Sequence, residues 1–573
     1  MSHGPESPSD LAPLLCCILA AAWSCSPAQA PADTEIPKQA EASAPSDSPS
    51  DTSGEPACNP LPAVSQPRWF DGPVAYEIFV RSFSDSDGDG IGDFKGIVQK
   101  LDHLSDGKPG AGNDLNVSLL WLMPVSPSPS YHGYDVTDYR GVNPDYGTMA
   151  DFQSLLAEAH ARGIRVITDL VLNHSSSSHP WFVDAAQGPS APHRSWYVWS
   201  DVPLTWPQPW GSGNTWHASK SGWYYGLFSS GMPDLNYLEP AVAQEMTDTA
   251  GFWLDAGLDG FRLDAVRYLV EEGPGDGMQD TPATIAFWKQ LAKDLLKTHG
   301  DALLVGEAWA SNNVAALYHA GAAGLNMTFD FDLMEALVAG LLARDVTDIR
   351  NVLCARATQF PPSAALGTFL ANHDLLRLSA RLKADAARSR LAATLLLLLP
   401  GTPFIYYGEE IGMANGPSTD DKHKRTPMQW DATPSAGFTS GKPWTQVNAE
   451  YPTVNVAAQD ADPDSLLNLY RSLSRLRTST PALQWGSFEL VPATSKTTTA
   501  VWAFLRSRGP SSVVVIVSFS DASALDVRVT LPPSSAASSG TEAWPAAAAV
   551  VVSGNVVMAG DVGPLSARVI ALQ

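Results

Sequence analysis

The sequence predicts a parallel (β/α)8 TIM barrel that carries an inserted domain and is followed by an antiparallel β-sandwich. Three observations support this fold class. Eight apolar, strand-like segments alternate with helical segments after residue 69, one long polar stretch interrupts the alternation, and the helical signal stops near residue 479. Strands of a parallel barrel are buried on both faces and are therefore nearly continuous apolar runs, as these segments are.

The barrel strands are expected, in chain order, at 74–80, 118–123, 164–171, 259–266, 303–305, 327–331, 368–370 and 403–407. Apolar residues with helical spacing predict helices between them, the clearest at 94–103, 149–162, 285–297 and 465–476. The barrel therefore comprises 69–174 and 237–478.

Two regions depart from this alternation. Residues 175–236 are too long for an ordinary connection between a strand and a helix, so we interpret them as a small inserted domain. Segments 500–505 and 512–518 alternate like antiparallel strands, which predicts the sandwich at 479–573.

The composition is that of a globular protein, with 44% hydrophobic and 17% charged residues in a chain of 573. The net charge of −24 argues against nucleic acid and anionic membrane surfaces as partners, because both are negatively charged. An uncharged substrate such as a sugar is compatible with this charge. We expect a monomer.

Residues 1–30 resemble an export signal with a short apolar run, although no basic residue precedes that run. The signal can end at the A-x-A site of residues 28–30, or at Cys25 if this residue receives a lipid. Residues 31–68, rich in Pro, Ser and Ala, are expected to be a disordered tether. We therefore expect an exported protein, either extracellular or anchored to the outer membrane as a lipoprotein. Cys58 and Cys354 indicate no disulfide framework.

Polar residues follow four of the predicted strands. His174 comes after the third, Arg262 and Asp264 end the fourth, Glu307 ends the fifth, and a His-Asp pair at 373–374 ends the seventh. Active sites of such barrels lie at the carboxyl ends of the strands, so these side chains are expected to converge on one rim.

Three carboxylates without a nucleophilic Ser or Cys indicate glycoside chemistry, in which one carboxylate attacks the sugar and one carboxylic acid donates a proton. Asp264 is the better nucleophile, because Arg262 on the same strand face keeps it ionised. Glu307 lies between an apolar strand and Trp309, surroundings that raise a carboxyl pKa as an acid/base requires. Asp374 remains to hold substrate hydroxyls.

The motifs DLVLNH, GFRLDAV, LVGEAW and FLANHD occur in this order and resemble the four main signature regions of the alpha-amylase family, glycoside hydrolase family 13. GPVAYEIFVRSFSDSDGDGIGDFKGI, MPDLN and GTPFIYYGEEIGM resemble further regions. The resemblance implies an α-glucan substrate, a domain B at 175–236 and a domain C at 479–573. It implies that Asp264 is the catalytic nucleophile, Glu307 the acid/base and Asp374 the transition-state stabiliser. It also implies that the sugar is bound by His174, His373, Arg262 and a stacking Tyr134. Trp309 and Arg267 are further candidates for sugar binding.

An acidic loop provides a candidate metal site. Asp85, Asp87, Asp89 and Asp93, with the backbone carbonyl of Ile91, repeat the first part of an EF-hand calcium loop, but Gly96 stands where the last ligand would be. Four carboxylates this close repel one another unless a cation neutralises them. The family resemblance also implies a structural Ca²⁺ here, far from catalysis.

Seven tryptophans crowd 181–223, and sugar rings stack on aromatic faces. Some of the seven are therefore expected to line the cleft, while most of them form the core of the inserted domain.

The specificity within the family rests on a few positions. MPDLN is similar to neopullulanases and to an intermediate group of bacterial alpha-amylases. Tyr131 stands where exo-acting glucosidases have an Asp that closes the site, which favours an endo-acting alpha-amylase. Arg267-Tyr268 replaces a common Lys-His, which puts in doubt a leaving-group subsite and a second calcium site, and TPMQW at 426–430 is more typical of glucosidases.

The alternatives are therefore a neopullulanase or cyclomaltodextrinase, an oligo-1,6-glucosidase-like enzyme, and a transglycosylase or isomerase of the trehalose synthase type. A non-catalytic carbohydrate-binding relative is disfavoured, because all three acids are present.

Overall fold

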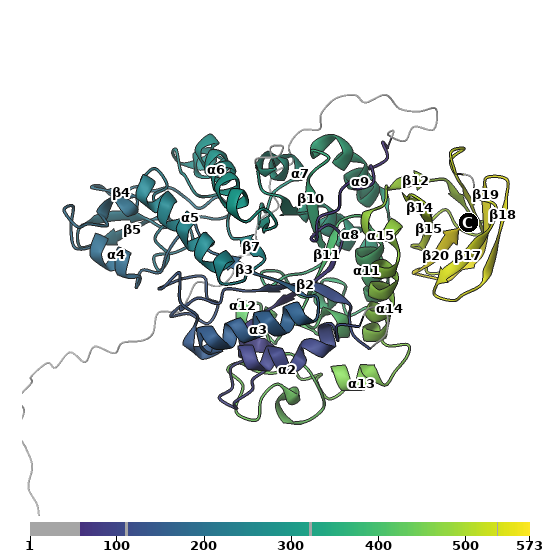
Figure 1. Cartoon of the computed structure of the whole chain (residues 1–573), viewed down its shortest axis with the longest axis horizontal. Helices are drawn as coiled ribbons and strands as arrows, with labels where there is room; N and C mark the ends of the chain where they lie inside the picture. The colour runs from purple at the N-terminus through teal and green to yellow at the C-terminus, as the bar shows by residue number, and fades with distance from the viewer. Residues whose placement is uncertain (1–57, 109–112, 320–323, 536) are drawn as a thin grey trace, which may run out of the picture. The chain divides into compact units, whose positions relative to one another are not determined.

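The computed structural model describes residues 58–108, 113–319, 324–535 and 537–573. A closed barrel of parallel strands forms its centre, and neighbouring strands follow the order β1-β2-β3-β7-β8-β9-β10-β11 (Figure 1). These strands are β1 Val74–Ile78, β2 Val117–Leu122, β3 Arg165–Leu170, β7 Gly260–Leu263, β8 Leu303–Gly306, β9 Met327–Phe329, β10 Ala365–Phe369 and β11 Thr402–Tyr406. The predicted fold class is confirmed.

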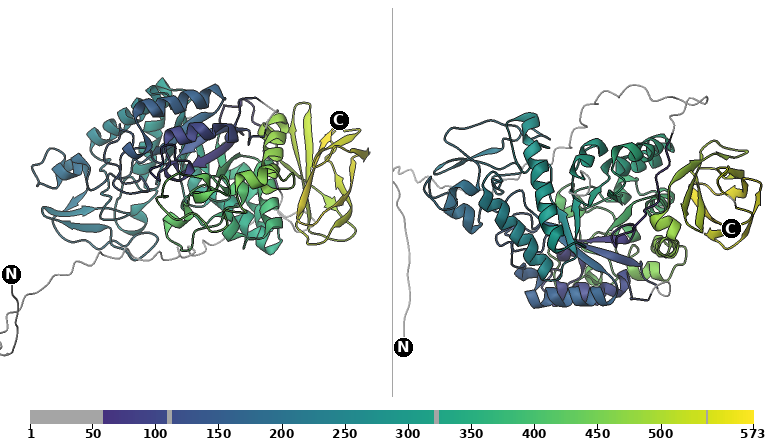
Figure 2. Two further views of the ribbon diagram at one scale, coloured as in Figure 1. Left: turned by 90° about the horizontal axis from the view of Figure 1, so that it is seen from below. Right: turned by 45° about the horizontal axis from the view of Figure 1, so that its top comes forward.

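Helices surround the outside of the barrel (Figure 2). A capping box fixes the start of α3, because the side chains of Thr148 and Asp151 each accept from the other's backbone N–H. The longer helices are α2 Phe94–Leu104, α3 Met149–Ala161, α5 Pro240–Asp255, α6 Pro282–Thr298, α8 Phe331–Ala343, α9 Thr347–Gln359, α11 Ala386–Leu398 and α14 Leu466–Ser479. The shorter helices are α1 Val80–Phe83, α4 Pro180–Ala185, α7 Asn312–Ala315, α10 Leu378–Arg381, α12 Asp421–Lys424, α13 Val456–Asp460 and α15 Pro481–Trp485.

Four strands are shorter than the sequence predicts, and β3 lacks one residue of its predicted range at each end. β1 ends at Ile78 because α1 begins two residues later. β9 ends at Phe329 because the carboxylate of Asp330 caps α8, accepting from the N–H of Leu333. β7 ends at Leu263, and Ala265, predicted to lie in the strand, has a left-handed backbone with φ of 50°.

The stretch 175–236 holds a small antiparallel sheet in the order β4-β6-β5, with strands β4 Trp199–Ser200, β5 Trp216–Ser219 and β6 Gly222–Tyr225. Trp216, Tyr225 and Leu227 form a core there together with Met278 from the barrel. Both Trp residues of the β5–β6 hairpin therefore contribute to a hydrophobic cluster, as the aromatic composition predicts for most of the seven.

The C-terminal region is a nine-stranded, mostly antiparallel sheet in the order β12-β14-β15-β20-β17-β18-β19-β16-β13. Its strands are β12 Glu489–Val491, β13 Ala493–Thr494, β14 Val501–Arg508, β15 Ser511–Ser518, β16 Ala524–Thr530, β17 Gly540–Trp544, β18 Ala549–Ser553, β19 Val556–Val562 and β20 Ser566–Leu572. One face packs on the barrel helices through residues such as Phe504 and Val515. The opposite face encloses a core of its own that includes Val514, Ile516 and Val557.

Residues 58–68 are not a disordered tether. Leu61 pairs with Phe488 in an antiparallel bridge, and the N–H of Val64 donates to Trp485. A disulfide joins Cys58 to Cys354 in α9, a pairing that the sequence analysis did not predict. The reason is spatial, because the fold brings together two residues 296 positions apart.

The expected export signal and residues 31–57 of the expected tether lie outside the described residues. Within the ranges that the structure describes, no helix is both long enough and apolar enough to cross a membrane.

Candidate active site

The predicted site residues converge at the carboxyl ends of β3, β7, β8 and β10. The register explains why Asp264 and Glu307 lie at the same level: Leu263 of β7 pairs with Gly306 of β8, and each carboxylate is the next residue along its strand. Likewise Asp169 of β3 pairs with Arg262 of β7, so this acid and this base lie side by side in the barrel.

Arg262 lies at the centre of the site and is 1% exposed. Its Nη1 lies 2.5 Å from Asp264 and also contacts Asp169, while its Nη2 lies 2.7 Å from Glu307. One guanidinium therefore touches three carboxylates. Because Asp264 and Glu307 both contact this guanidinium, their carboxyl groups lie close to each other. Because one cation cannot neutralise three anions, the local charge balance favours a proton on one of the acids.

Glu307 is the acid on which that proton is expected. Burial raises the pKa of Glu307 to about 7 although Arg262 opposes this shift, which confirms the direction predicted from the surrounding sequence. Its Oε2 accepts from the N–H of Ala265 at 3.1 Å. The left-handed backbone of Ala265 is uncommon for a residue other than glycine, and it lies immediately beside a predicted catalytic residue.

Asp374 has the opposite electrostatics. Burial favours its neutral form, but His373 and Arg425 hold the pKa of Asp374 well below its usual range. Nε2 of His373 lies 2.9 Å from one carboxylate oxygen, and Nη2 of Arg425 lies 2.9 Å from the other. Arg425 also donates to the backbone carbonyl of His373, so it fixes both residues of the pair. Asp374 is therefore an ionised carboxylate with a defined orientation.

Glu77, a site residue that sequence reasoning missed, is the next-to-last residue of β1. Its carboxylate is 2.6 Å from Nδ1 of His373. Burial alone would lower the pKa of His373, but Asp374 and Glu77 raise it to about 10, so the imidazole is charged and donates from both nitrogens. The available signal for Glu77 was a carboxylate inside the apolar run 74–80. Sequence reasoning also missed Arg425, which immediately precedes TPMQW.

Tyr134 lies against this group, as predicted. Its ring stacks on His373 with centroids 5.6 Å apart, and its hydroxyl is 2.6 Å from Nε2 of His373. His174 is buried and its Nε2 lies 3.2 Å from the backbone carbonyl of Tyr134, while Nδ1 faces the side chain of Asn173. Burial lowers the pKa of His174, so the two histidines of the site differ in charge.

Arg267 and Trp309 lie next to the nucleophile and acid/base candidates but are engaged by the protein. The guanidinium of Arg267 is paired with Asp280 at 2.5 Å and donates to the carbonyl of Trp309 at 2.8 Å. The Trp309 ring stacks on Phe331, with centroids 5.1 Å apart. Arg267 therefore supports the segment that carries Glu307, while the half-buried Trp309 keeps part of its surface exposed.

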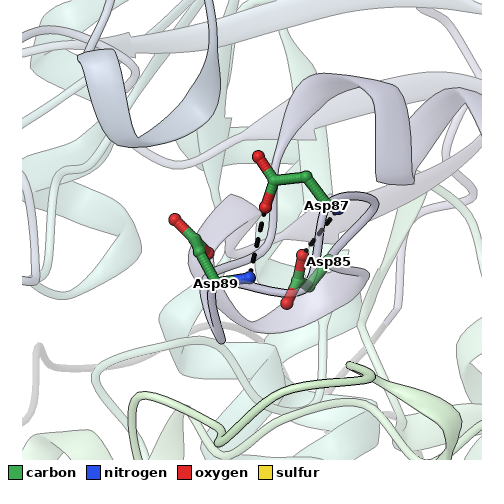
Figure 3. A group of neighbouring side chains, drawn as sticks. All are labelled: Asp85, Asp87 and Asp89. Carbon is green, nitrogen blue, oxygen red and sulfur yellow. Dashed lines mark hydrogen bonds between the residues drawn. The ribbon is translucent and has the colours of Figure 1, made fainter.

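The acidic loop lies apart from these residues in sequence, between α1 and α2. Asp85, Asp87 and Asp89 each offer a carboxylate oxygen, and these oxygens lie within 4.8 Å of one another (Figure 3). Oxygen atoms so arranged fit a hard divalent cation. Asp93, predicted as a fourth ligand, caps α2 and accepts from the N–H groups of Gly96 and Ser86, because it immediately precedes the helix. The roles of Asp93 and of the carbonyl of Ile91 as ligands stay predictions.

A family model described as "Alpha amylase, catalytic domain" matches residues 77–486. The chain belongs to the alpha-amylase family. "Alpha-amylase 3" of Dictyoglomus thermophilum is 37% identical over 430 residues, covering 74% of this chain and 80% of the relative. An oligo-1,6-glucosidase of Parageobacillus thermoglucosidasius is 32% identical over 523 residues, covering 79% and 91%. The crystal structure of an alpha-amylase from H. orenii matches with a TM-score of 0.76 and 36% identity, covering 88% of this chain and all of that one.

This membership makes the protein a glycosidase of glycoside hydrolase family 13. The names of the relatives include both an alpha-amylase and an oligo-1,6-glucosidase, so membership alone leaves the linkage that is cleaved undetermined.

Replacing Glu77 by Gln should weaken catalysis, because Glu77 acts on the site through His373. The change keeps the shape but removes the charge that stabilises the imidazolium of His373. We expect kcat/KM on an α-glucoside to fall about 10- to 100-fold, since a hydrogen bond to a charged group contributes about 1.5–3 kcal/mol. We also expect the pKa of His373, measured by NMR, to fall. Glu335→Gln, which removes a surface partner of Arg381, is the matched control. An unchanged His373 titration in Glu77→Gln would contradict this role.

Proposed function

We propose that the protein is a retaining, endo-acting alpha-amylase that hydrolyses α-1,4-glucosidic bonds of starch and maltodextrins through a covalent glycosyl–Asp264 intermediate. The observation that carries the proposal is the pairing of Asp264 and Glu307. They leave neighbouring strands at one level and contact the same guanidinium. Retaining glycosidases require two such carboxyl groups on either side of one anomeric carbon.

In the first step, protonated Glu307 gives its proton to the glycosidic oxygen while an oxygen of Asp264 bonds to C1 and the C1–O bond breaks. In the second step, water attacks C1, Glu307 takes a proton from that water, and the bond to Asp264 breaks. A pKa of about 7 suits Glu307 for both roles, because its protonated and ionised forms are both accessible near neutral pH.

The remaining residues have supporting roles. Ionised Asp374, together with His373, would hold hydroxyls of the glucosyl ring, and the negative charge of Asp374 would stabilise positive charge that develops at C1. The ring of Tyr134, fixed by stacking on His373, would lie against the face of that sugar. Arg262 contacts Asp264 directly and orients its carboxylate.

The endo specificity rests on Tyr131. Family members that remove single sugars from chain ends have an Asp there, whereas Tyr131 in this chain stacks on Trp444 with centroids 5.3 Å apart. A neutral aromatic pair leaves room for further sugar units of a longer chain. The similarity to an oligo-1,6-glucosidase makes α-1,6 hydrolysis the second candidate, and TPMQW at 426–430 favours it.

A product profile tests this specificity. Purified protein incubated with soluble starch should release maltooligosaccharides and shorten the average chain rapidly. Isomaltose should react much more slowly, because the proposed site is open to α-1,4-linked chains. Asp264→Asn should abolish all activity, which excludes a contaminating amylase. Slow release of glucose from chain ends, preferential cleavage of isomaltose, or products equal in size to the substrate would reject endo-hydrolysis.

We propose that Ca²⁺ binds the acidic loop of Asp85, Asp87 and Asp89. Three carboxylates that can approach one atom suit this ion, which prefers six to eight oxygen ligands. Their mutual repulsion also contributes, after burial, to raising the pKa of Asp89. The loop is tied to a distant segment, since Asp85 accepts from the hydroxyl of Thr439 and the N–H of Trp444 donates to Gly90. Bound calcium would therefore stabilise the contact between the acidic loop and the segment of Thr439 and Trp444.

Removing calcium with a chelator should lower the thermal midpoint. A ligand at a hundred times its Kd stabilises the folded state by about 2.7 kcal/mol. The double variant Asp87→Asn/Asp89→Asn should lose this response, and without calcium it should be at least as stable as the wild type because the repulsion is gone. Asp201→Asn, an exposed acid elsewhere, should keep the full response. A double variant that still responds to calcium would place the ion at another site.

We further propose that the protein is exported. The sequence of residues 1–30 supports this, and so does the disulfide between Cys58 and Cys354, because disulfides persist in oxidising compartments. Mass spectrometry of the mature N-terminus distinguishes the two endings of the signal. Cleavage after Ala30 gives an unmodified Pro31, whereas a lipoprotein begins with an acylated Cys25 in the membrane fraction. An unprocessed N-terminus would contradict export through this signal.

A further inference from the structure

The loop that follows β7 folds back onto its own start through Asp280. The backbone N–H of Asp280 donates to the carbonyl of Arg267 at 2.7 Å. The two carboxylate oxygens of Asp280 accept from Nε of Arg267 at 3.1 and 3.0 Å, and one of them also accepts from Nη2 at 2.5 Å. Asp280 therefore holds Arg267 with its backbone and with its side chain, in the forked geometry that suits a guanidinium and a carboxylate.

The same pair is bound to the connection that follows β8. Nη1 of Arg267 donates to the carbonyl of Trp309 at 2.8 Å. Tyr318, a buried residue at the end of the 3-10 helix η4 Ala316–Tyr318, donates from its hydroxyl to Asp280 at 2.6 Å. The stretch 309–318 is thus held at both of its ends by one ion pair. We refer to Arg267, Asp280 and Tyr318 as the loop clamp.

The loop clamp acts beyond the point where the two strands stop pairing. β7 and β8 pair up to the residues immediately before Asp264 and Glu307. The N–H of Glu307 makes one further bond, to the carbonyl of Leu263 at 3.0 Å. Arg267 comes three residues after Asp264, and Trp309 comes two residues after Glu307. The loop clamp therefore joins, past the strand ends, the two segments that carry the nucleophile and the acid/base.

Arg267 is committed to this task. All three of its guanidinium nitrogens donate to Asp280 or to the carbonyl of Trp309, and the residue is buried. Asp280 has a left-handed backbone with φ of 53°, a conformation that Asp adopts more readily than most residues. The backbone and the side chain of Asp280 are therefore both suited to the place where the loop returns to Arg267.

We propose that Asp280 and Tyr318 are positioning residues for the acid/base Glu307. They act through Arg267, whose bond to the carbonyl of Trp309 fixes the segment that follows Glu307. This inference rests on the proposed function only in taking Glu307 as the proton donor. A retaining mechanism requires its two carboxyl groups to lie about 5–5.5 Å apart, and a displacement of about 1 Å in an active site costs up to about 100-fold in rate. The loop clamp maintains that spacing.

A purely structural role makes a different prediction, and the leaving group of the substrate separates the two. Phenyl α-maltoside and 4-nitrophenyl α-maltoside transfer the same maltosyl unit and carry a benzene ring in the same place. The 4-nitrophenolate ion departs readily without a proton, whereas phenolate depends on one, so general acid catalysis matters more for the phenyl substrate. A displaced acid should slow the phenyl substrate more. General damage to the fold, or a lost contact with the leaving group, should slow both alike.

The test measures kcat/KM of Asp280→Asn and Tyr318→Phe on both substrates. In Asp280→Asn an amide group replaces one of the oxygens that accept from Arg267, and we expect the reaction of the phenyl substrate to slow about 10- to 100-fold. The reaction of the 4-nitrophenyl substrate should slow by a clearly smaller factor. Tyr318→Phe removes one hydrogen bond and should shift the ratio of the two rates in the same direction by about threefold.

Two further variants calibrate the comparison. Tyr470→Phe is the matched control, because the Tyr470 hydroxyl also donates from a buried ring to a carboxylate, that of Glu409 at 2.8 Å, and it should leave the ratio unchanged. Glu307→Gln removes the acid itself and should give the largest shift. Asp280→Asn leaves a buried guanidinium without its anion, which lowers stability, so Tyr318→Phe decides the outcome if Asp280→Asn does not fold.

Equal losses on both substrates, an unchanged ratio in the clamp variants, or the same shift in Tyr470→Phe would overturn the proposal. Failure of the proposed function is a separate result. If Glu307→Gln slows both substrates alike, Glu307 is not the proton donor and the assigned mechanism fails. If the wild type cleaves aryl α-glucosides but no α-maltosides, the proposed specificity fails, and the phenyl and 4-nitrophenyl α-glucosides serve for the same comparison.

Discussion

The site depends on one buried guanidinium that is shared among three carboxylates. Arg262 is fixed by the parallel register of β3, β7 and β8, which brings Asp169, Asp264 and Glu307 within its reach. Burying a charge is costly unless partners compensate it, so these side chains hold one another in place. The same excess of negative charge keeps one acid protonated and creates an environment that favours a positively charged sugar. Structure and chemistry therefore rest on a single electrostatic arrangement.

A second arrangement of charges holds the third acid. Glu77, His373, Asp374 and Arg425 alternate in charge, and they come from β1, from the end of β10 and from the segment after α12. Glu307 is poised to exchange a proton, while Asp374 is held ionised. Asp374 and Glu307 lie on one rim but differ in protonation. Asp374 has several cations as neighbours, whereas Glu307 shares Arg262 with two more acids.

Much of this was predictable from the sequence, and the exceptions have physical reasons. Polar residues at the ends of apolar strands are local signals, and they identified Asp264, Glu307 and Asp374. Glu77 was missed because its partner lies 296 residues away. Ala265 continues the apolar alternation of GFRLDAV, yet β7 has already ended there, since its neighbour β8 pairs only as far as Gly306. Asp93 fits a metal-loop pattern and a helix cap equally well by sequence, and the structure shows the cap because Asp93 directly precedes α2.

The disulfide between Cys58 and Cys354 has a mechanical consequence. Noncovalent contacts of 58–68, such as the bridge between Leu61 and Phe488, could be peeled away one at a time under tension. A pull on the chain ahead of Cys58 is instead transmitted through a covalent bond directly into α9. The stretch behind the bond, together with the strands it leads to, is shielded from that load. The disulfide therefore protects the fold from being unravelled from this end.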